Sequence, residues 1–422
     1  MQKSHKTQTV NILKLVHGGQ GMGALDDGRK IFVWNALPGE DVLTQINKSK
    51  KDYAEGLAIE VIKSSQDRVS PKDELYLSTS PWQIISYSAE NEAKRQILSD
   101  VLLHEKIDYN QLIEFYAPIS EWFYRNKMEY SFYGDDKGLH LALYDRGTHR
   151  KRIITSSSIA RQEIDEVAGK ICAVLNKNNV RAGDLKSLVL RCNSQGEVVV
   201  ALFVKQENFK KIEELSNICK GLVVVFSNPK SPASLRTKDL YQYGDVSLIE
   251  KICGTTIQYD VFSFFQVNLE IFSKALNEII DEVGDSGVVD IYSGVGTIGV
   301  CLKNPKALVE IDNSNVVFAK INAKNTNKKI DVIQASSEKA LDYINPDDFL
   351  VVDPPRAGLH KNLIEKIIDV KPPKIIYLSC NPSTQARDLK LLEESYVIKK
   401  ITGYNFFPKT PHIESLAVLV RK

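Results

Sequence analysis

The chain has 422 residues, of which 43% are hydrophobic and 26% charged, so it can bury a core and fill two or three domains. A net charge of +2 and a pI near 8.0 neither demand nor exclude nucleic-acid binding. There is no apolar run of about 18 residues, and no two of the six cysteines form a C-x-x-C pair, which argues against a membrane span, a zinc site and a redox dithiol. A reduced, cytoplasmic setting is expected.

Residues 1–65 are predicted to form a small β-barrel. Short β-like runs such as VNILKLV and GLAIEVIK alternate there with the glycine-rich turns HGGQGMG, DDGR and LPGE. This alternation is typical of small all-β barrels. The stretch SSQDRVSPKDE then reads as a linker.

Residues 75–255 are predicted to form an α+β domain. SAENEAKRQILSDVLLHE has helical spacing with Ser88 as the expected cap, and SIARQEIDEVAGKICAVLNKNN predicts a second helix. Hairpins are expected around 134–136 and 194–196.

Residues 256–422 are predicted to form the third domain, a Rossmann-like α/β fold with a doubly wound parallel sheet. Helical stretches alternate there with apolar runs, and strands that are buried on both faces read in this way. The expected strands are GVVDIYSG, ALVEID, DDFLVVDPP, KIIYLSC and SLAVLVRK.

A glycine loop follows the first of these strands. Gly294-x-Gly296-x-x-Gly299 suits a ligand that approaches the backbone at a helix N-terminus, as in dinucleotide-binding folds and in S-adenosylmethionine methyltransferases. We expect Asp290 to face the ligand, where it would repel a pyrophosphate and suit the cationic methionine end of S-adenosylmethionine. Glu310 ends the next strand and can accept both ribose hydroxyls. A tight turn that binds nothing remains an alternative.

An acid-proline loop, DPPRAG, follows a third strand. Pro354 and Pro355 stiffen the chain after Asp353, which could orient a cofactor or a base, while Arg356 could meet a phosphate. Amino-methyltransferases commonly carry an aromatic residue at the position of Arg356, so amine methylation is disfavoured. The alternative without a binding role is a turn followed by a helix cap.

Cys380 ends the strand KIIYLSC in a turn fixed by Pro382, whereas the other five cysteines read as small core residues. Turn amides and a helix N-terminus could stabilise a thiolate there. A methyltransferase needs such a nucleophile for carbon 5 of uracil, because addition at carbon 6 first makes carbon 5 reactive. A base must then remove the carbon-5 proton, and Glu414 is the candidate. His412 is expected to be a structural or polar neighbour.

Taken together, the chain resembles the S-adenosylmethionine-dependent RNA uridine-5 methyltransferases along its whole length. The motifs FSFFQVN, DIYSGVGTIG, DPPRAG, SCNPST and HIE occur in the family's order, and the N-terminal zone is similar to an RNA-binding TRAM domain. The resemblance implies Cys380 as nucleophile and Glu414 as base. It implies the following residues at the cofactor: Gln266, Tyr292, Thr297, Glu310 and Asp353. It also implies that Phe264 lies where base and cofactor meet.

One departure concerns iron. Many relatives with a TRAM domain hold an iron–sulfur cluster on four cysteines, three of them in the stretch that matches LSTSPWQIISY. Here that stretch has Ser78, Ser80 and Pro81, and no cysteine occurs from 1 to 171. Because such clusters need thiolates, no iron–sulfur cluster and no other metal is predicted.

RNA is the expected partner, with neither DNA nor a membrane involved. Basic runs beside aromatic residues, KSKK, YRNK, RGTHRKR and KNNVR, could meet phosphates and unpaired bases. By resemblance 23S rRNA is the preferred substrate and the T-loop uridine of tRNA the alternative, and a monomer is expected. Two other functions stay open: a non-catalytic RNA-binding module and a dinucleotide oxidoreductase.

Overall fold

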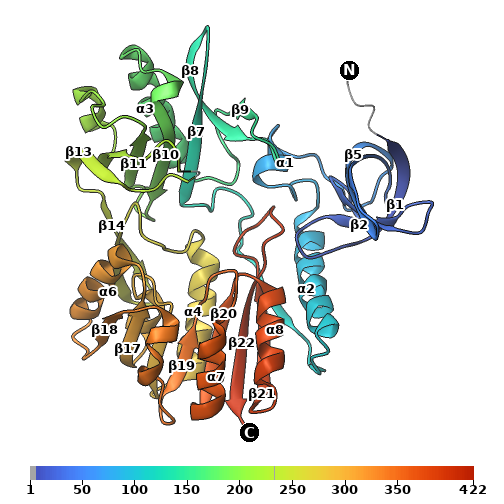
Figure 1. The fold of residues 1–422 in the computed structure, drawn as a ribbon, viewed down its shortest axis with the longest axis vertical. Coiled ribbons are helices and arrows are strands. Elements are labelled where there is room, and N and C mark those ends of the chain that lie inside the picture. The colour runs from blue at the N-terminus through green and yellow to red at the C-terminus, as the bar shows by residue number, and fades with distance from the viewer. Residues whose placement is uncertain (1–5, 232) are drawn as a thin grey trace.

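The computed structural model describes residues 6–231 and 233–422. Their strands form a closed five-stranded barrel, a seven-stranded sheet, a two-stranded sheet and an eight-stranded sheet. In Figure 1 the barrel lies to one side of α2, and the seven-stranded sheet lies above the eight-stranded one. Within the described ranges, no helix combines the length and the apolar character needed to cross a bilayer.

The N-terminal strands close into a barrel in the order β1-β2-β3-β5-β4, which confirms the predicted small β-barrel. Their bounds are β1 (Thr7–Leu15), β2 (Gly21–Ala24), β3 (Lys30–Trp34), β4 (Asp41–Ser49) and β5 (Tyr53–Lys63). Alternate residues such as Val10 and Ile12 point into the barrel and are almost fully buried. At Gly23 a Cβ would lie 2.4 Å from the carbonyl oxygen of Asn11, so only glycine lets β1 and β2 approach this closely.

The central sheet has the order β13-β12-β11-β10-β7-β8-β9, and α3 (Gln162–Lys177) packs against it through an apolar stripe. Both expected hairpins are present, since β7 pairs with β8 and β10 pairs with β11. The bounds are β7 (Lys127–Asp135), β8 (Gly138–Tyr144), β9 (Lys151–Ile153), β10 (Leu185–Cys192), β11 (Val198–Val204), β12 (Gly221–Phe226) and β13 (Lys238–Gly244). Two short 3-10 helices accompany them, Ala182–Asp184 and Glu213–Asn217. The small hairpin β14 (Ser247–Ile252) and β15 (Thr255–Asp260) follows.

The third sheet has the order β18-β17-β16-β19-β20-β22-β21-β6. Its strands β16 to β20 are parallel, as predicted for a doubly wound fold. The strand SLAVLVRK, expected in the parallel set, is instead antiparallel to β20, because the chain returns through a hairpin with β21. The strands are β16 (Gly287–Ile291), β17 (Asn304–Glu310), β18 (Asp331–Gln334), β19 (Phe349–Val352), β20 (Lys374–Ser379), β21 (Tyr396–Tyr404) and β22 (Glu414–Arg421).

Helices cover both faces of this sheet, as in other doubly wound folds. They are α4 (Leu269–Val283), α5 (Thr297–Cys301), α6 (Asn313–Asn325), α7 (Lys361–Val370) and α8 (Pro382–Leu392), with 3-10 turns at Ser337–Lys339 and Leu341–Tyr343. The chain order of the parallel strands reverses between β16 and β19. Ligands of such folds bind at the carboxyl ends of the strands near this reversal.

Part of the segment expected in the central domain packs on the third sheet instead. The strand β6 (Glu114–Tyr116) extends that sheet beside β21, and α2 (Tyr87–His104) contacts α8 and β21. The short α1 (Tyr76–Thr79) precedes α2. Ser88 is not the cap of α2. The helix begins two residues earlier than such a cap would allow, at Tyr87, and Ser86 stands at the N-cap. The Tyr87 hydroxyl donates to the carbonyl of Pro118.

Candidate active site

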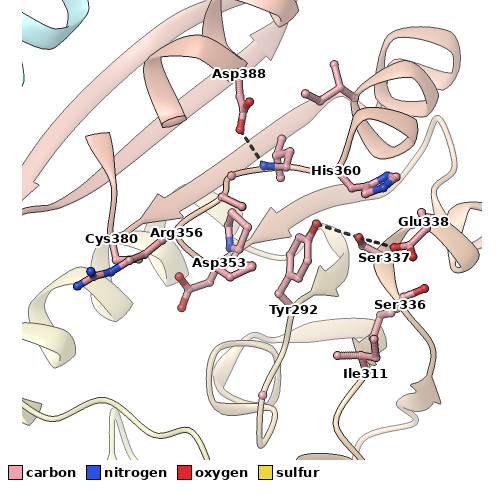
Figure 2. Close-up of a pocket in the computed structure, with 18 of the residues that line it drawn as sticks. Tyr292, Ile311, Ser336, Ser337, Glu338, Asp353, Arg356, His360, Cys380 and Asp388 are labelled. Atoms are coloured by element: carbon pink, nitrogen blue, oxygen red, sulfur yellow. Dashed lines mark hydrogen bonds between the residues drawn. The ribbon is translucent and has the colours of Figure 1, made fainter. Parts of the chain in front are cut away.

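A cavity of about 1230 Å³ opens at the carboxyl ends of the parallel strands (Figure 2). Six of the seven predicted site residues line it: Gln266, Tyr292, Glu310, Asp353, Cys380 and Glu414. The seventh, Thr297, lies at the start of α5 and borders a narrow adjoining hollow together with Gln266 and Asp353. The cavity exceeds the usual size of a small-molecule site, so it has room for a cofactor and a second group.

The glycine loop contacts the carboxylate of Glu310. Gly294 and Gly296 have φ angles of 56° and 83°, in the left-handed region that glycine tolerates. The amide of Gly294 donates to one carboxylate oxygen of Glu310 at 2.8 Å, and the amide of Asp312 donates to the other at 2.7 Å. The loop therefore fixes Glu310 at the cavity wall.

Asp290 does not face the cavity, contrary to the sequence expectation. Its side chain is buried behind the glycine loop, where Oδ2 accepts a hydrogen bond from the amide of Gly299 at 2.9 Å. Burial raises the pKa of Asp290 to about 8. The strand alternation that carries Asp290 away from the ligand edge thus makes it a support for the first turn of α5.

Tyr292 begins the loop in a conformation that is uncommon for a bulky residue, with φ at 69°. Its hydroxyl donates to Ser337 Oγ at 2.9 Å, across the cavity wall in Figure 2. Ser336, Ser337 and Glu338 follow the short strand β18 and line the cavity with Ile311 and His360. The sequence analysis missed these residues because it did not identify β18; the polar run after VIQA was the available signal.

The acid-proline loop is held from below by Asp388 on α8. Asp388 Oδ2 accepts hydrogen bonds from the Tyr377 hydroxyl and the amide of Leu359, both at 2.8 Å. A Cβ on Gly358 would lie 2.5 Å from the same oxygen, and the φ of Gly358 is 81°, so both space and backbone require glycine. This packing presents Asp353 and Arg356 at the cavity.

Cys380 sits between the end of β20 and the N-cap of α8, which is Asn381. The Asn381 side chain accepts from the amide of Ser383 and donates to the carbonyl of Arg356 at 2.9 Å. Pro382, at the first turn of α8, suits a position where no amide is needed. The turn therefore presents the thiol beside the acid-proline loop, next to a helix N-terminus.

Acidic side chains outnumber basic ones in the lining of the cavity. Burial raises the pKa of Asp353 to about 7, while burial and the neighbouring Asp353 raise the pKa of Glu414 well above its usual value. Burial, Glu414 and Asp353 together raise the pKa of Cys380 to about 12. Arg356 is the cation that opposes these shifts at Cys380 and Glu414.

His412 lines the cavity as a neutral ring. Burial, followed by the charge of Arg356, lowers its pKa to about 3. Its Nδ1 lies 3.4 Å from Arg356 Nη2, so the ring accepts from the guanidinium there. The edge of His412 also packs on Phe407, with ring centroids 5.7 Å apart. His412 is therefore a neutral side chain that contacts Arg356, in agreement with the prediction that it is a polar neighbour of the site.

The stretch LSTSPWQIISY, where no iron–sulfur cluster is predicted, is connected to its surroundings by hydrogen bonds. The amide group of Gln83 donates to Ser80 Oγ at 2.7 Å and to Asp73 Oδ2 at 2.9 Å, and its oxygen accepts from the amides of Lys72 and Asp73. Asp73 in turn binds the amide and the hydroxyl of Ser158. In residues 6–231 and 233–422, no three His, Cys, Asp or Glu side chains gather as a metal site would require.

Two sequence families account for nearly the whole chain. The profile of the tRNA (uracil-5-)-methyltransferase family matches residues 86–422, and the TRAM domain profile matches residues 2–59. The chain belongs to the tRNA (uracil-5-)-methyltransferase family. It is thus an S-adenosylmethionine-dependent RNA uracil-5 methyltransferase with an N-terminal TRAM domain.

Similar proteins span the full length of the chain. An uncharacterized RNA methyltransferase of Lactobacillus johnsonii is 31% identical, with 100% of this chain and 99% of that protein covered. Another from Enterococcus faecalis is 30% identical over 99% and 98%. The crystal structure of Pyrococcus abyssi tRNA (uracil-54, C5)-methyltransferase in complex with S-adenosyl-L-homocysteine has a TM-score of 0.82 at 23% identity and covers 97% of this chain and 100% of that one. This last likeness establishes the common fold.

Proposed function

We propose that this protein methylates carbon 5 of a specific uridine in 23S rRNA, with Cys380 as the nucleophile and Glu414 as the base. The observation that carries the proposal is the cavity itself, where one thiol and one unpaired buried carboxylate line the same space as Asp353. The pKa of Glu414 is shifted by burial and by charges, with no hydrogen bond contributing. A carboxylate without a donor is free to accept a proton from a substrate.

The residues around the cavity fit S-adenosylmethionine. Asp353, Glu310 and Glu414 line the same cavity, and their carboxyl groups would be compensated by the sulfonium and ammonium groups of that ligand. We propose that Gln266, Tyr292, Glu310 and Asp353 hold it, with Thr297 supporting the glycine loop. Bound there, S-adenosylmethionine supplies the methyl group for carbon 5.

In the proposed reaction the Cys380 thiolate adds to carbon 6 of uracil and forms a carbon–sulfur bond. The displaced electron pair makes an enolate, from which carbon 5 takes the methyl group. Glu414 then removes the carbon-5 proton, the double bond re-forms and the bond to Cys380 breaks. Arg356 favours the ionised forms of both residues. Phe264, 62% exposed at the cavity wall, is available to stack on a uridine flipped from its RNA.

We assign RNA capture to the barrel (1–65) and the central part (75–255), and catalysis to residues 256–422, in a cytoplasmic monomer. Several of the basic runs carry local acidic partners: Lys48 pairs with Glu55, and Arg181 with Asp184. Arg146 instead lies over the ring of Trp34 at 4.2 Å, a cation held by an aromatic residue of the barrel. 23S rRNA is the preferred substrate, and the tRNA named by the family profile and by the Pyrococcus protein is the alternative.

The test is transfer of labelled methyl from S-adenosylmethionine to protein-free 23S rRNA and, separately, to unmodified tRNA, with the product nucleoside identified. Cys380-dependent 5-methyluridine in 23S rRNA is the expected result. The same product in tRNA alone would replace the substrate but keep the chemistry. Methylation that persists in Cys380→Ala would overturn the covalent mechanism.

A further inference from the structure

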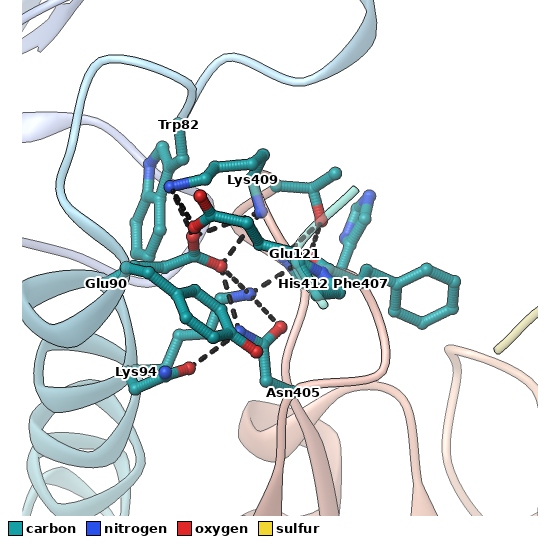
Figure 3. Close-up of polar contacts among 12 residues, drawn as sticks. Trp82, Glu90, Lys94, Glu121, Asn405, Phe407, Lys409 and His412 are labelled. Atoms are coloured by element: carbon teal, nitrogen blue, oxygen red, sulfur yellow. Dashed lines mark hydrogen bonds and ion pairs between the residues drawn. The ribbon is translucent and has the colours of Figure 1, made fainter. Parts of the chain in front are cut away.

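A second group of charged side chains is buried between α2 and the loop that connects β21 to β22 (Figure 3). Glu90 and Lys94 project from one face of α2, and Lys409 comes from the loop. The side chains of Glu90 and Lys94 have no exposed surface, and that of Lys409 is 2% exposed. Nothing in the proposed chemistry uses these charges directly.

The network grips the loop at several points. Lys94 Nζ donates to Asn405 Oδ1 at 2.6 Å and to the carbonyl of Phe407 at 3.1 Å, besides pairing with Glu90 at 2.9 Å. The backbone amide of Lys409 donates to the two carboxylate oxygens of Glu90, at 2.9 and 3.1 Å. The ammonium of Lys409 pairs with Glu121 at 2.8 Å and donates to the carbonyl of Ile85. Two lysines and two glutamates thus balance one another.

The same loop is also fixed from the barrel side. Trp82 donates its backbone amide to the carbonyl of Lys409 at 3.0 Å and its indole N–H to the carbonyl of Gly19 at 2.9 Å. A Cβ on Gly19 would lie 2.4 Å from Pro411, so the β1–β2 turn of the barrel touches the loop closely. Lys409 itself has φ at 61°, a strained conformation that its surroundings must enforce.

The anchored loop contributes residues to the active-site cavity. Phe407 and His412 line the active-site cavity, and the loop ends at Glu414, the first residue of β22. The backbone of Glu414 is paired with Tyr404 of β21, and Phe407 and His412 of the loop line the same cavity as its side chain. A nine-residue connection between strands would be free to move without anchors. Cys380 follows β20, which pairs with β22 up to Ser379 and Ser415, so the sheet sets the backbones of Cys380 and Glu414, and the anchored loop sets Phe407 and His412 in the same cavity.

We propose that Glu90, Lys94 and Lys409 are positioning residues that set the carboxylate of Glu414 for removal of the carbon-5 proton. This inference rests on the proposed function. Its consequence is specific: loosening the loop slows the step in which the methylated uracil leaves Cys380, without weakening the earlier steps that build the carbon–sulfur bond. The enzyme then accumulates as a covalent adduct with its RNA.

The experiment measures turnover, cofactor affinity and the fraction of protein joined to RNA on a denaturing gel. Lys94→Met removes the hydrogen bonds to Asn405 and Phe407. If this variant folds poorly, the double variant Glu90→Gln with Lys94→Met is used instead, because it removes one charge of each sign and leaves the net charge of the network unchanged. We expect both to lower kcat about 10- to 100-fold, as small misplacements of catalytic groups do, with adduct accumulating and cofactor affinity unchanged.

A matched control is Lys374→Met, which breaks the half-buried pair of Lys374 with Glu282 at the opposite end of β20. We expect it to lower the melting temperature without trapping adduct. Equal trapping in Lys374→Met, or loss of turnover without trapping in Lys94→Met and in the double variant, would overturn the positioning role. Glu414→Gln separates the base role of Glu414 from the positioning role of the network. If Glu414→Gln traps no adduct, Glu414 is not the base and the positioning role fails as well. If Glu414→Gln traps adduct and the network variants do not, only the positioning role is refuted.

Discussion

Two clusters of buried charge lie on either side of the β21–β22 loop, and they are built in opposite ways. In the α2 cluster, the carboxylate of Glu90 and the ammonium groups of Lys94 and Lys409 each have several partners within hydrogen-bond distance. In the cavity, the pKa values of Asp353 and Glu414 are raised by burial with no hydrogen bond to offset it. Buried charges destabilise a fold unless they are paired, so the first cluster supports structure and the second awaits a ligand.

This difference also explains why catalytic carboxylates can be recognised by their electrostatics. A paired carboxylate keeps its charge and does nothing further, whereas an unpaired one is ready to exchange a proton or to receive a cation. The cavity holds two such carboxyl groups, Asp353 and Glu414, and the Cys380 thiol, and Arg356 favours the ionised forms of Glu414 and Cys380. Breaking one member at a time separates their roles.

The largest effect is expected at Glu414. Glu414→Gln keeps the shape and removes the base, so kcat should fall by about 10²–10⁴-fold, the range of general-base contributions. Methyl transfer to the RNA within the adduct should persist, since that step precedes proton removal. Single-turnover assays with labelled cofactor measure both quantities. Unchanged turnover would exclude Glu414 as the base.

A smaller effect is expected at Asp353, on the cofactor rather than on turnover. Because its pKa is raised to about 7, Asp353 is increasingly protonated as the pH falls below that value, and a cationic ligand favours the ionised form. Affinity for S-adenosylmethionine should therefore fall by up to about tenfold per pH unit below pH 7 and level off above it.

Calorimetry on the wild type and on Asp353→Asn between about pH 5 and pH 8 measures this dependence. The variant should bind about 10- to 100-fold more weakly at the upper end, the range expected for a hydrogen bond or pairing to a charged group, and lose most of the pH dependence. A variant that retains the full pH dependence would assign the titration to another carboxylate, with Glu414 the first to examine.

The sequence could predict the cavity but not the α2 cluster, for a physical reason. Apolar runs that end in Glu310, Asp353 and Cys380 mark strand ends, and parallel strands bring their carboxyl ends together, so local patterns locate these residues in space. Lys94 and Lys409 are more than 300 positions apart, and a lysine in an amphipathic helix reads as a solvated residue. Only the tertiary packing of α2 on the loop shows that it is buried.

Local patterns also failed where the facing direction of a side chain decided its role. Asp290 lies at a strand end as expected, but it points behind the glycine loop, and β22 runs antiparallel although its apolar run resembles the others. A short strand such as β18 has too few apolar residues to be noticed. The roles of Cys380 and Glu414 remain predictions that the assays above test.

Asp290 lies between the two clusters in its pairing, because its buried carboxyl group accepts one hydrogen bond, from the amide of Gly299. Its pKa is raised to about 8 in the folded state, so the fold favours the protonated form and loses stability as the pH rises from about 4 to 8. Asp290→Asn cannot ionise and can still accept from Gly299. We expect it to raise the free energy of unfolding by on the order of 1–3 kcal/mol above pH 8 and to change little near pH 4.

Urea unfolding at several pH values measures the stability of this variant. Its affinity for S-adenosylmethionine should match the wild type, because Asp290 does not line the cavity. Weaker binding with unchanged stability would instead return Asp290 to the ligand-facing role that the sequence suggested.

The smallest effect is expected for a charge pair on the surface. Lys14 of the barrel pairs with Asp100 of α2, and the two side chains are 50% and 30% exposed. Exposed pairs of this kind contribute about 0–1 kcal/mol, so Asp100→Asn should change the free energy of unfolding by less than about 1 kcal/mol. The difference should vanish in about 1 M salt, where the screening length is only about 3 Å. Urea unfolding at low and high salt measures it. A loss of several kcal/mol that persists in high salt would show that the barrel depends on this contact with α2. An exposed pair would then stabilise the fold as much as the buried pairs of the α2 cluster do.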